Sequence, residues 1–297
     1  MISARIVEAP VGMEALSAHR YHEFWGGLGD ILNHVYWLPC YGALPSMKEG
    51  ERAFITVSSH NPHAHELFLW HPKAAQITIC NIGFHCSFQD PSSRDPLKLP
   101  RGGCFHSLPG GPVEFYPHPS DGPAIDDARG LGRYLIFACA SAEQDKYVPQ
   151  PIVDAAAARA LAAGWSIVVL GRNYIHHLYD FPRDTNSWRK EVRIAPSGGV
   201  LDLVDRLTVP GVMKVIQGAT GVFTAHSAVC MASYNMKKPT FVLYNEFAKK
   251  TYLPKPGEPW QGYFHGAGNP NCENAWFPEY TESRMDRWLA GLKEISR

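Results

Sequence analysis

Short apolar runs alternate with helix-like segments along this chain of 297 residues, and that alternation most constrains its fold. Seven runs are rich in β-branched or aromatic residues and bounded by turn residues, which is typical of buried parallel strands. They are residues 20–26, 52–59, 75–81, 132–140, 165–171, 221–227 and 240–245. Helical candidates lie between them, at about 30–38, 61–70, 151–163, 200–207 and 228–235. The pattern predicts an α/β fold with helices on both faces of parallel sheets.

The alternation breaks between residues 84 and 133, where Pro and Gly dominate and regular elements are expected to be short. We interpret this stretch as loops that end in a linker near 123–133. Because the chain exceeds the length that one average core supports, we expect two domains, 1–130 and 131–280. Residues 281–297 form an amphipathic helix in this interpretation. Its apolar stripe comprises Met285, Trp288, Leu289, Leu292 and Ile295.

Composition narrows the possible partners. Lys and Arg balance Asp and Glu at 28 each, and the chain contains no basic block, which counts against a passive nucleic-acid binder. We find no run of about 18 apolar residues and no signal-peptide pattern in the opening residues, so neither a membrane span nor secretion is expected. The seven cysteines lack CxxC spacing, which favours buried thiols in a reducing cytoplasm over disulfides or zinc.

Histidines gather between residues 60 and 71, namely His60, His63, His65 and His71. Histidine is a common metal ligand, but His63 and His65 would face different sides of a helix and no carboxylate follows at the spacing of a zinc protease. We therefore favour polar contacts at a helix start over a metal site, and expect no metal.

A glycine-rich turn, "GGLGD", lies between the run at 20–26 and the helix expected at 30–38. A helix start of this kind exposes backbone N–H groups that stabilise an anion, and its glycines allow close approach. Asp30 has two interpretations there, a helix cap or a catalytic carboxylate. Taken alone, the motif favours the cap, because it lacks the spacing of a dinucleotide or P-loop motif.

Two further segments place polar residues just after expected strands. Lys146 follows the strand at 132–140, at the edge where open α/β sheets bind ligands. Ser227 is an expected helix cap, with His226 before it and Ala228 behind it, and leaves room for a phosphate. Each residue also has an ordinary structural interpretation, as a solvated lysine, a cap or a strand-end histidine. Gly171, Arg172 and Asn173 follow the strand at 165–171 and are candidates for holding a base or ribose.

Taken in order, "GGLGDIL", "SAEQDKYVP", "SIVVLG" and "DLVDRL" followed by "GATGVFTAHSAVCMASYNMKKPTFVLY" resemble the ADP-heptose:lipopolysaccharide heptosyltransferase family of GT-B glycosyltransferases, glycosyltransferase family nine. The resemblance implies two Rossmann-like domains facing each other across a cleft, with a C-terminal helix able to cross back to the first domain. It makes Asp30 the catalytic base and Lys146 a contact of the donor phosphates. It matches "LDLVDRL" to a short helix and the segment ending at Pro239 to the diphosphate cradle.

The cradle departs from the family pattern, with His226 at its Asp, Ala228 at its Gly and Met231 at its His; only Ser227 is retained. The resemblance still reverses the local preference at Asp30 in favour of catalysis. It implies inverting, metal-independent sugar transfer with a nucleotide-diphosphate sugar as co-substrate and no other cofactor. The substrate-binding candidates are Gly27, Leu28, Gly29, Lys146, Gly171, Arg172, Asn173, His226, Ser227 and Ala228.

Two alternatives stay open: a non-hydrolysing nucleotide-sugar epimerase, and a GT-B-derived binding protein that has lost catalysis. His226 and Met231, which stand where the family has Asp and His, motivate the second alternative. The acceptor also stays open, since a saccharide, a protein side chain, a small metabolite and a modified DNA base are all compatible with a neutral chain.

Overall fold

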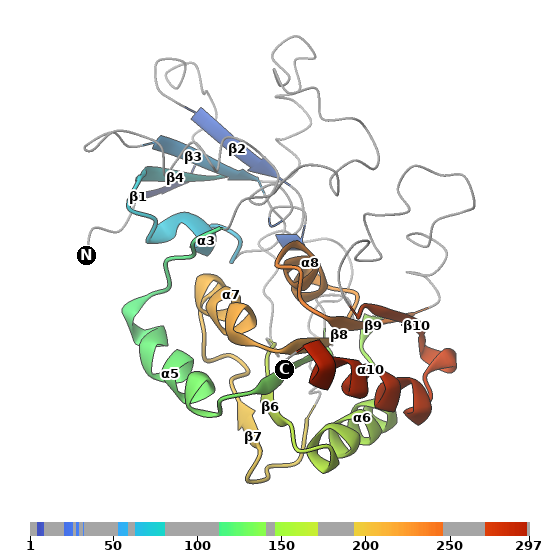
Figure 1. Cartoon of the computed structure of the whole chain (residues 1–297). Coiled ribbons are helices and arrows are strands. Elements are labelled where there is room, and N and C mark those ends of the chain that lie inside the picture. The colour runs from blue at the N-terminus through green and yellow to red at the C-terminus, as the bar shows by residue number, and fades with distance from the viewer. Residues whose placement is uncertain are drawn as a thin grey trace.

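The computed structural model describes residues 5–8, 21–25, 28–29, 32, 53–58, 63–80, 113–140, 146–171, 193–245 and 271–295. The chain forms two parallel sheets (Figure 1). The first has four strands in the order β1-β4-β3-β2. They are β1 (Arg5–Glu8), β2 (Tyr21–Trp25), β3 (Ala53–Ser58) and β4 (Ala74–Cys80). Helix α3 (Glu66–Leu69) connects β3 to β4, as a parallel pairing requires a crossover.

The second sheet has six parallel strands in the order β10-β9-β8-β5-β6-β7. Its strands are β5 (Tyr134–Ala138), β6 (Ser166–Val169), β7 (Val200–Asp202), β8 (Gly221–Ala225), β9 (Thr240–Tyr244) and β10 (Glu273–Trp276). β5, β8 and β9 are buried at every residue, because helices cover both faces. The chain moves outward from β5 to β7 and then returns to β8 beside β5. The strand order therefore reverses between β5 and β8.

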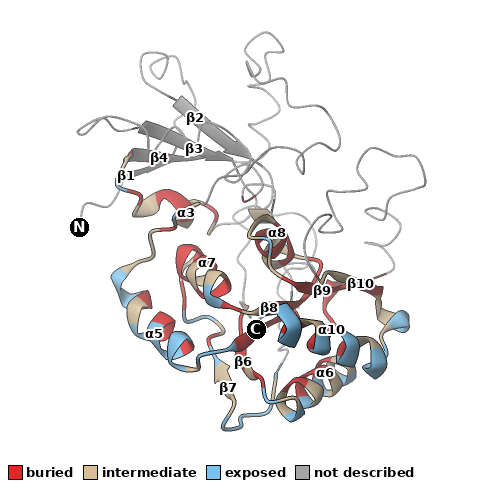
Figure 2. Ribbon diagram, in the orientation of Figure 1, coloured by how far each residue is buried: buried red, intermediate tan, exposed pale blue. Residues whose placement is uncertain are grey.

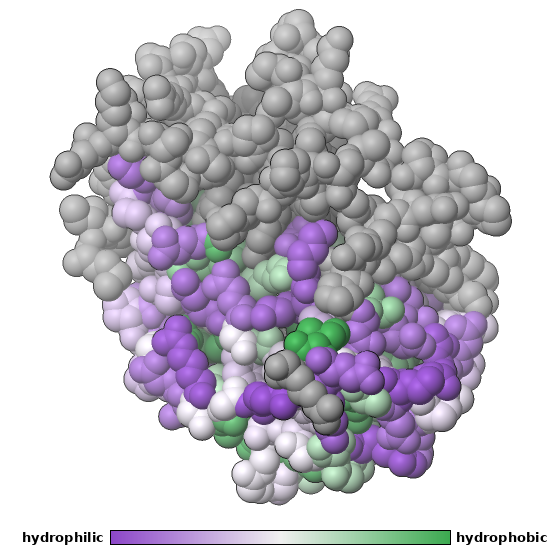
Figure 3. Space-filling model, viewed as in Figure 1, coloured by the Kyte–Doolittle hydropathy of each residue, from purple (hydrophilic) through white to green (hydrophobic). Residues whose placement is uncertain are grey.

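Helices α5 (Gly122–Gly130) and α7 (Val209–Gly218) cover one face, and α6 (Gln150–Ala162) and α10 (Glu282–Ile295) cover the other (Figure 2). Side chains alternate accordingly along β5: Ile136 enters the core beneath α7, while Leu135 and Phe137 enter the core beneath α6 and α10. We call these the α7 core and the α10 core. Figure 3 shows mostly hydrophilic residues on the outer surface over α5 and α10, as expected for helices that bury one face.

The α7 core continues into the first sheet. Leu67 and Phe68 of α3, Ile77 of β4 and Phe115 share this core with Met213 of α7, and all five are almost completely buried. Two hydrogen bonds join the same parts: the Val209 N–H donates to Glu66 Oε2 at 2.8 Å, and the Gln217 amide donates to the Val113 carbonyl oxygen at 3.0 Å. Helix α7 is thus the element against which the two sheets meet.

The structure confirms all seven expected strands and the helix at 228–235, which is α8 (Ala228–Asn235). It contradicts the helix expected at 200–207, where residues 200–202 form strand β7 and Ile167 pairs with Val200. The turn at Gly198 and Gly199 delivers this segment to the open edge of β6, and edge pairing overrides its helix-like spacing. Residues 203–207 then turn, with Asp205 at φ 58°.

Two other expectations are wrong. The linker expected near 123–133 is largely α5, which is preceded by the 3₁₀ turn η2 (Pro119–Asp121) and packs on α7. The C-terminal helix does not cross back within residues 282–295. Met285, Trp288, Leu289 and Leu292 are buried in the α10 core on the six-stranded sheet, and Ile295 is 51% exposed.

The division of the chain into two domains at residue 130 stays a prediction. The helix expected at 30–38 lies outside the described residues apart from Leu32, and α3 is shorter than expected at 61–70. Among the described helices, none has the length and apolarity that a membrane span requires.

Candidate active site at the carboxyl edge of the six-stranded sheet

The carboxyl ends of β5 and β8 lie side by side where the strand order reverses, the usual ligand position in open α/β sheets. The buried hydroxyl of Thr224, the next-to-last residue of β8, donates to the Ala138 carbonyl oxygen at 2.9 Å and so joins the two strand ends. The Ser227 Oγ lies 3.5 Å from the same hydroxyl. The start of α8 is therefore anchored to the centre of the sheet.

Ser227 is the N-cap of α8, with extended backbone at φ −149° and ψ −177°. In the described part of the chain its side chain accepts no cap hydrogen bond from the first turn. Serine at this position ordinarily satisfies one of the N–H groups at a helix start. The first turn of α8 thus lacks the side-chain acceptor that its N-cap residue would supply, which suits it to an external anion.

Gly29 lies against this helix start. A Cβ atom at Gly29 would be 3.2 Å from Met231 Cγ and 3.6 Å from Ala228 Cα, so the backbone at Gly29, which is helical together with Leu28, lies directly against the start of α8. Leu28 and Gly29 are half-buried, and Leu28 packs against the α7 core. Two segments that are about 200 residues apart in the sequence therefore meet at one place. Gly27 and Asp30 lie outside the described residues.

His226 lies between β8 and α8 and is 8% exposed. Its backbone N–H donates to the Leu243 carbonyl oxygen at 3.2 Å, which extends the pairing of β8 with β9 by one residue. Its ring stacks on the Tyr244 ring, with centroids 5.1 Å apart and planes at 29°. The imidazole is therefore held in a fixed orientation at the strand end.

Lys146 is 9% exposed and belongs to the segment that follows β5. The Val148 N–H donates to the Cys139 carbonyl oxygen at 3.0 Å, so this segment folds back onto the end of β5. Gly171 follows β6 at the same edge, and its carbonyl oxygen accepts from the Asp205 N–H at 3.1 Å. Arg172 and Asn173 lie outside the described residues. The described candidates thus share one edge of the sheet.

The described histidines of the cluster lie beside α3. His63 Nδ1 is 2.8 Å from Glu66 Oε1, and His71 Nδ1 accepts from the Lys73 N–H at 3.1 Å. Burial lowers the pKa of His71 to about 4, although the Glu114 carboxylate opposes this. Three or more metal-ligating side chains do not come together anywhere in the described residues. His60 lies outside them.

The sequence reasoning missed the residues that occupy the start of α7. Asp121 Oδ1 accepts from the Thr208 N–H at 3.1 Å, and Asp121 Oδ2 accepts from the Thr208 hydroxyl. The Thr208 side chain caps the Gly211 N–H, and Glu66 binds the Val209 N–H. A Thr followed by Pro at the second helical position was the available signal for this helix. The approach of Asp121 and Glu66 depends on tertiary packing and leaves no local pattern.

No family model and no curated protein matches this chain. Solved structures do match it. The glycosyl transferase family 9 protein from Veillonella parvula has a TM-score of 0.57 at 10% identity, covering 93% of this chain and 98% of that chain. The ADP-heptose lipopolysaccharide heptosyltransferase II of E. coli has a TM-score of 0.54 at 11% identity, covering 94% of this chain and 100% of that one. The expected likeness in fold to the heptosyltransferases is confirmed, while the arrangement of the two sheets as two facing domains stays a prediction.

Proposed function

We propose that the protein is a glycosyltransferase that moves a sugar from a nucleotide-diphosphate sugar to a hydroxyl acceptor, with its two sheets belonging to the two domains of a GT-B enzyme. One observation carries the proposal: the backbone of Gly29 lies against the first turn of α8. The residue that follows Gly29 is Asp30. A carboxylate from the first sheet is thereby expected beside an anion-binding helix start of the second sheet.

The donor diphosphate is assigned to the start of α8. Its N–H groups and helix dipole favour negative charge, and Ser227 places no side-chain cap there in the described structure. Lys146 and His226, at the ends of β5 and β8, are the side chains proposed to contact the phosphates. These groups would stabilise the charge that develops on the diphosphate as it leaves the sugar.

Asp30 is the proposed general base. Its carboxylate takes the proton of the acceptor hydroxyl while that oxygen forms a bond to the anomeric carbon. The bond from that carbon to the diphosphate oxygen breaks in the same displacement, and the nucleoside diphosphate departs with the electron pair. A single displacement inverts the anomeric centre. We propose that the helix start and Lys146 replace a divalent metal in this step, and that no cofactor takes part.

The donor is tested by thermal shift with UDP-, GDP-, ADP-, CMP- and dTDP-sugars. A donor at a hundred times its dissociation constant stabilises the folded state by about 2.7 kcal/mol, which raises the melting temperature by several degrees. A shift with one base class supports the proposal and names the donor. The absence of a shift with every compound would instead favour a binding protein that has lost the donor site.

The base is tested with Asp30→Asn once a donor is known. We expect donor binding within about twofold of wild type and sugar transfer reduced by at least about 100-fold, since the amide cannot accept the proton. Asp127→Asn, on the exposed side of α5, is the matched control and should keep full transfer. Full transfer by Asp30→Asn would overturn the assigned role. An epimerised donor formed without acceptor would replace transferase by epimerase.

A further inference from the structure

Helix α8 rests partly on a small buried cluster of its own. This α8 cluster comprises Cys230, Met231, Tyr234, Val242 and Tyr244, with Cys272 packed at its edge. It is separate from the α7 core and the α10 core, and much smaller than either. Two of its members are tyrosines, whose hydroxyl groups require partners when buried. On this face, the placement of α8 therefore depends on directed hydrogen bonds as well as on apolar area.

Asn274 of β10 supplies those partners. The Tyr234 hydroxyl donates to Asn274 Oδ1 at 2.8 Å, and the Tyr244 hydroxyl donates to the same oxygen at 3.1 Å. Burial raises the pKa of both phenols well above the ordinary value, so both keep their protons. A carbonyl oxygen has two lone pairs, one for each donor. A single amide oxygen thus connects α8, β9 and β10.

The contact continues to the candidate site through Tyr244. The ring of this last residue of β9 supports the His226 imidazole, 5.1 Å away between centroids. Tyr234, in the last turn of α8, fixes the rotation of that helix about its axis. Asn274 therefore influences both the His226 ring and the first turn of α8. It does so from β10, far along the chain from Gly29 and Ser227.

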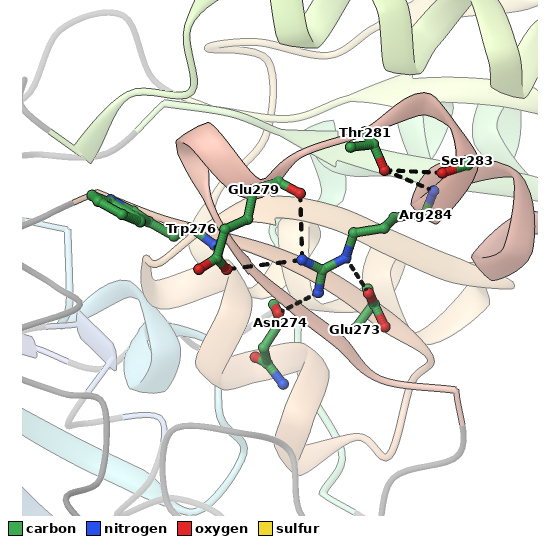
Figure 4. A network of polar contacts seen from close by, with 7 residues as sticks. All are labelled: Glu273, Asn274, Trp276, Glu279, Thr281, Ser283 and Arg284. Carbon is green, nitrogen blue, oxygen red and sulfur yellow. Dashed lines mark hydrogen bonds and ion pairs between the residues drawn. The ribbon is translucent and has the colours of Figure 1, made fainter.

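Asn274 is itself held by the C-terminal helix (Figure 4). The Arg284 guanidinium donates to the Asn274 carbonyl oxygen at 2.8 Å and to Glu273 Oε1 at 2.5 Å. Its other nitrogen lies 3.8 Å from Glu279 Oε2. Arg284 belongs to α10, and its side chain is 23% exposed. The position of the Asn274 backbone is thus set by a charged side chain as well as by pairing with β9.

We propose that Asn274 is a positioning residue of the donor site: its amide oxygen, by accepting both phenols, fixes the His226 ring and the first turn of α8 for the diphosphate. The inference rests on the proposed function, because the donor site that Asn274 would hold in place is itself part of that proposal. Asn274 does not contact the donor in this scheme. It acts through Tyr234 and Tyr244.

The test measures the affinity of ADP, GDP, UDP, CDP and dTDP for wild type by calorimetry, and then the tightest of these for the variants. Tyr244→Phe keeps the ring and removes the hydroxyl's contacts with Asn274 Oδ1, at 3.1 Å, and with the Tyr234 hydroxyl, at 3.3 Å. It should weaken binding about three- to tenfold. Asn274→Leu removes both hydrogen bonds and should weaken it at least as much. The matched control is Tyr134→Phe. Tyr134 is equally buried and donates to the Val215 carbonyl oxygen at 2.7 Å, but it belongs to the α7 core.

If Tyr244 had a merely structural role, Tyr244→Phe would behave like Tyr134→Phe. Both variants would then have a lower melting temperature, and both would keep the wild-type affinity when binding is measured well below that temperature. The amide resonances of Ala228 to Cys230 give a second reading. They should move in ligand-free Tyr244→Phe and stay in place in Tyr134→Phe.

The outcomes separate the two proposals. If wild type binds no nucleoside diphosphate, the proposed function fails and the inference falls with it. If wild type binds one of them and both Tyr244→Phe and Asn274→Leu keep its affinity, the inference alone is overturned. Should Asn274→Leu not fold, Tyr244→Phe still decides the question.

Discussion

Helices α7 and α8 both follow strands of the six-stranded sheet, yet their first turns are satisfied in different ways. At α7, the Thr208 side chain caps the helix, and the carboxylates of Asp121 and Glu66 bind the N–H groups of Thr208 and Val209. At α8, Ser227 makes no such cap in the described structure, and a glycine backbone lies against the turn. The protein's own anions fill one helix start, and the other is suited to an anion from outside.

Glycine permits close approach at both helix starts, with different neighbours. A Cβ atom at Gly211 would lie 2.6 Å from Asp121 Oδ2, so only glycine admits the carboxylate to the first turn of α7. At Gly29 the nearest neighbour is the flexible side chain of Met231. The α7 contact is therefore rigid and charged, while the α8 contact is apolar and adjustable. A rigid contact suits the place where the two sheets join, and an adjustable contact suits the proposed substrate site.

Removing an anion from α7 should have the largest effect on stability. Asp121→Ala leaves the half-buried Thr208 N–H and hydroxyl without their acceptor, so we expect the free energy of unfolding to fall by about 1–3 kcal/mol. Urea unfolding of the variant measures this. Nucleoside-diphosphate affinity below the transition should stay at the wild-type value. Reduced affinity with unchanged stability would show that the roles of the two helix starts are reversed.

Lowering the pH should also reduce the stability of the protein, through His71, which follows the helix α3 that packs on α7. Because the pKa of His71 is lowered to about 4, its folded state stays neutral between pH 6.5 and 4 while the unfolded chain takes up a proton. Stability is therefore full above about pH 6.5 and falls by up to about 3 kcal/mol as the pH drops toward 4. His71→Asn keeps an acceptor for the Lys73 N–H and should flatten this part of the pH profile. An unchanged profile would contradict the assignment, and His118→Asn serves as the control.

Filling the start of α8 with a carboxylate should convert it toward α7. Ser227→Asp supplies the missing cap, so we expect stability to rise by about 0.5–1 kcal/mol. The same charge should repel a diphosphate and weaken its binding at least about tenfold, equal to about 1.4 kcal/mol. Calorimetry measures the diphosphate affinity of wild type, Ser227→Asp and Ser227→Asn. Because Asn can cap the helix without a charge, the comparison separates the effect of charge from the effect of capping. Equal affinities for all three proteins would place the diphosphate elsewhere.

The smallest change is a single methyl group at the contact between the sheets. In Gly29→Ala the new Cβ requires Met231 to give way by a few tenths of an ångström, which we expect to cost less than about 1 kcal/mol of stability. Sugar transfer should fall more than stability, because a shift of Gly29 is expected to displace Asp30, the next residue in the chain. Gly130→Ala, where a Cβ meets nothing, is the matched control. A variant with normal transfer would show that the contact tolerates displacement.

Seven strands, together with α6 and α8, were predictable because their sequences are locally consistent with their structure, as in the fully buried run at 240–244, whereas β1 and β10 were not expected. α5 and α7 were missed because each begins with Gly or Pro in its first turn, which resembles a break in the pattern, although Pro is well tolerated there. β7 was mistaken for a helix because its apolar spacing fits both periods over so short a stretch.

The places of Ser227, His226 and Lys146 beyond the ends of β8 and β5 were predictable, while their roles stay predictions. The meeting of Gly29 with α8, and the two phenols on Asn274, depend on how the sheets and strands are brought together in space. Local sequence carries no record of such contacts. The position of a single residue relative to a strand end could therefore be predicted, whereas the contacts between distant residues could not.

The continuity of the α7 core across both sheets limits how this chain could exchange parts with a relative. A chimera joined at residue 130 would separate Phe68 and Phe115 from Met213, and Glu66 from the Val209 N–H. The transplanted piece would have to bring the matching surface of α7 with it. For recombination, the smallest portable unit of this molecule is the first sheet together with residues 208 to 218, and not either sheet by itself.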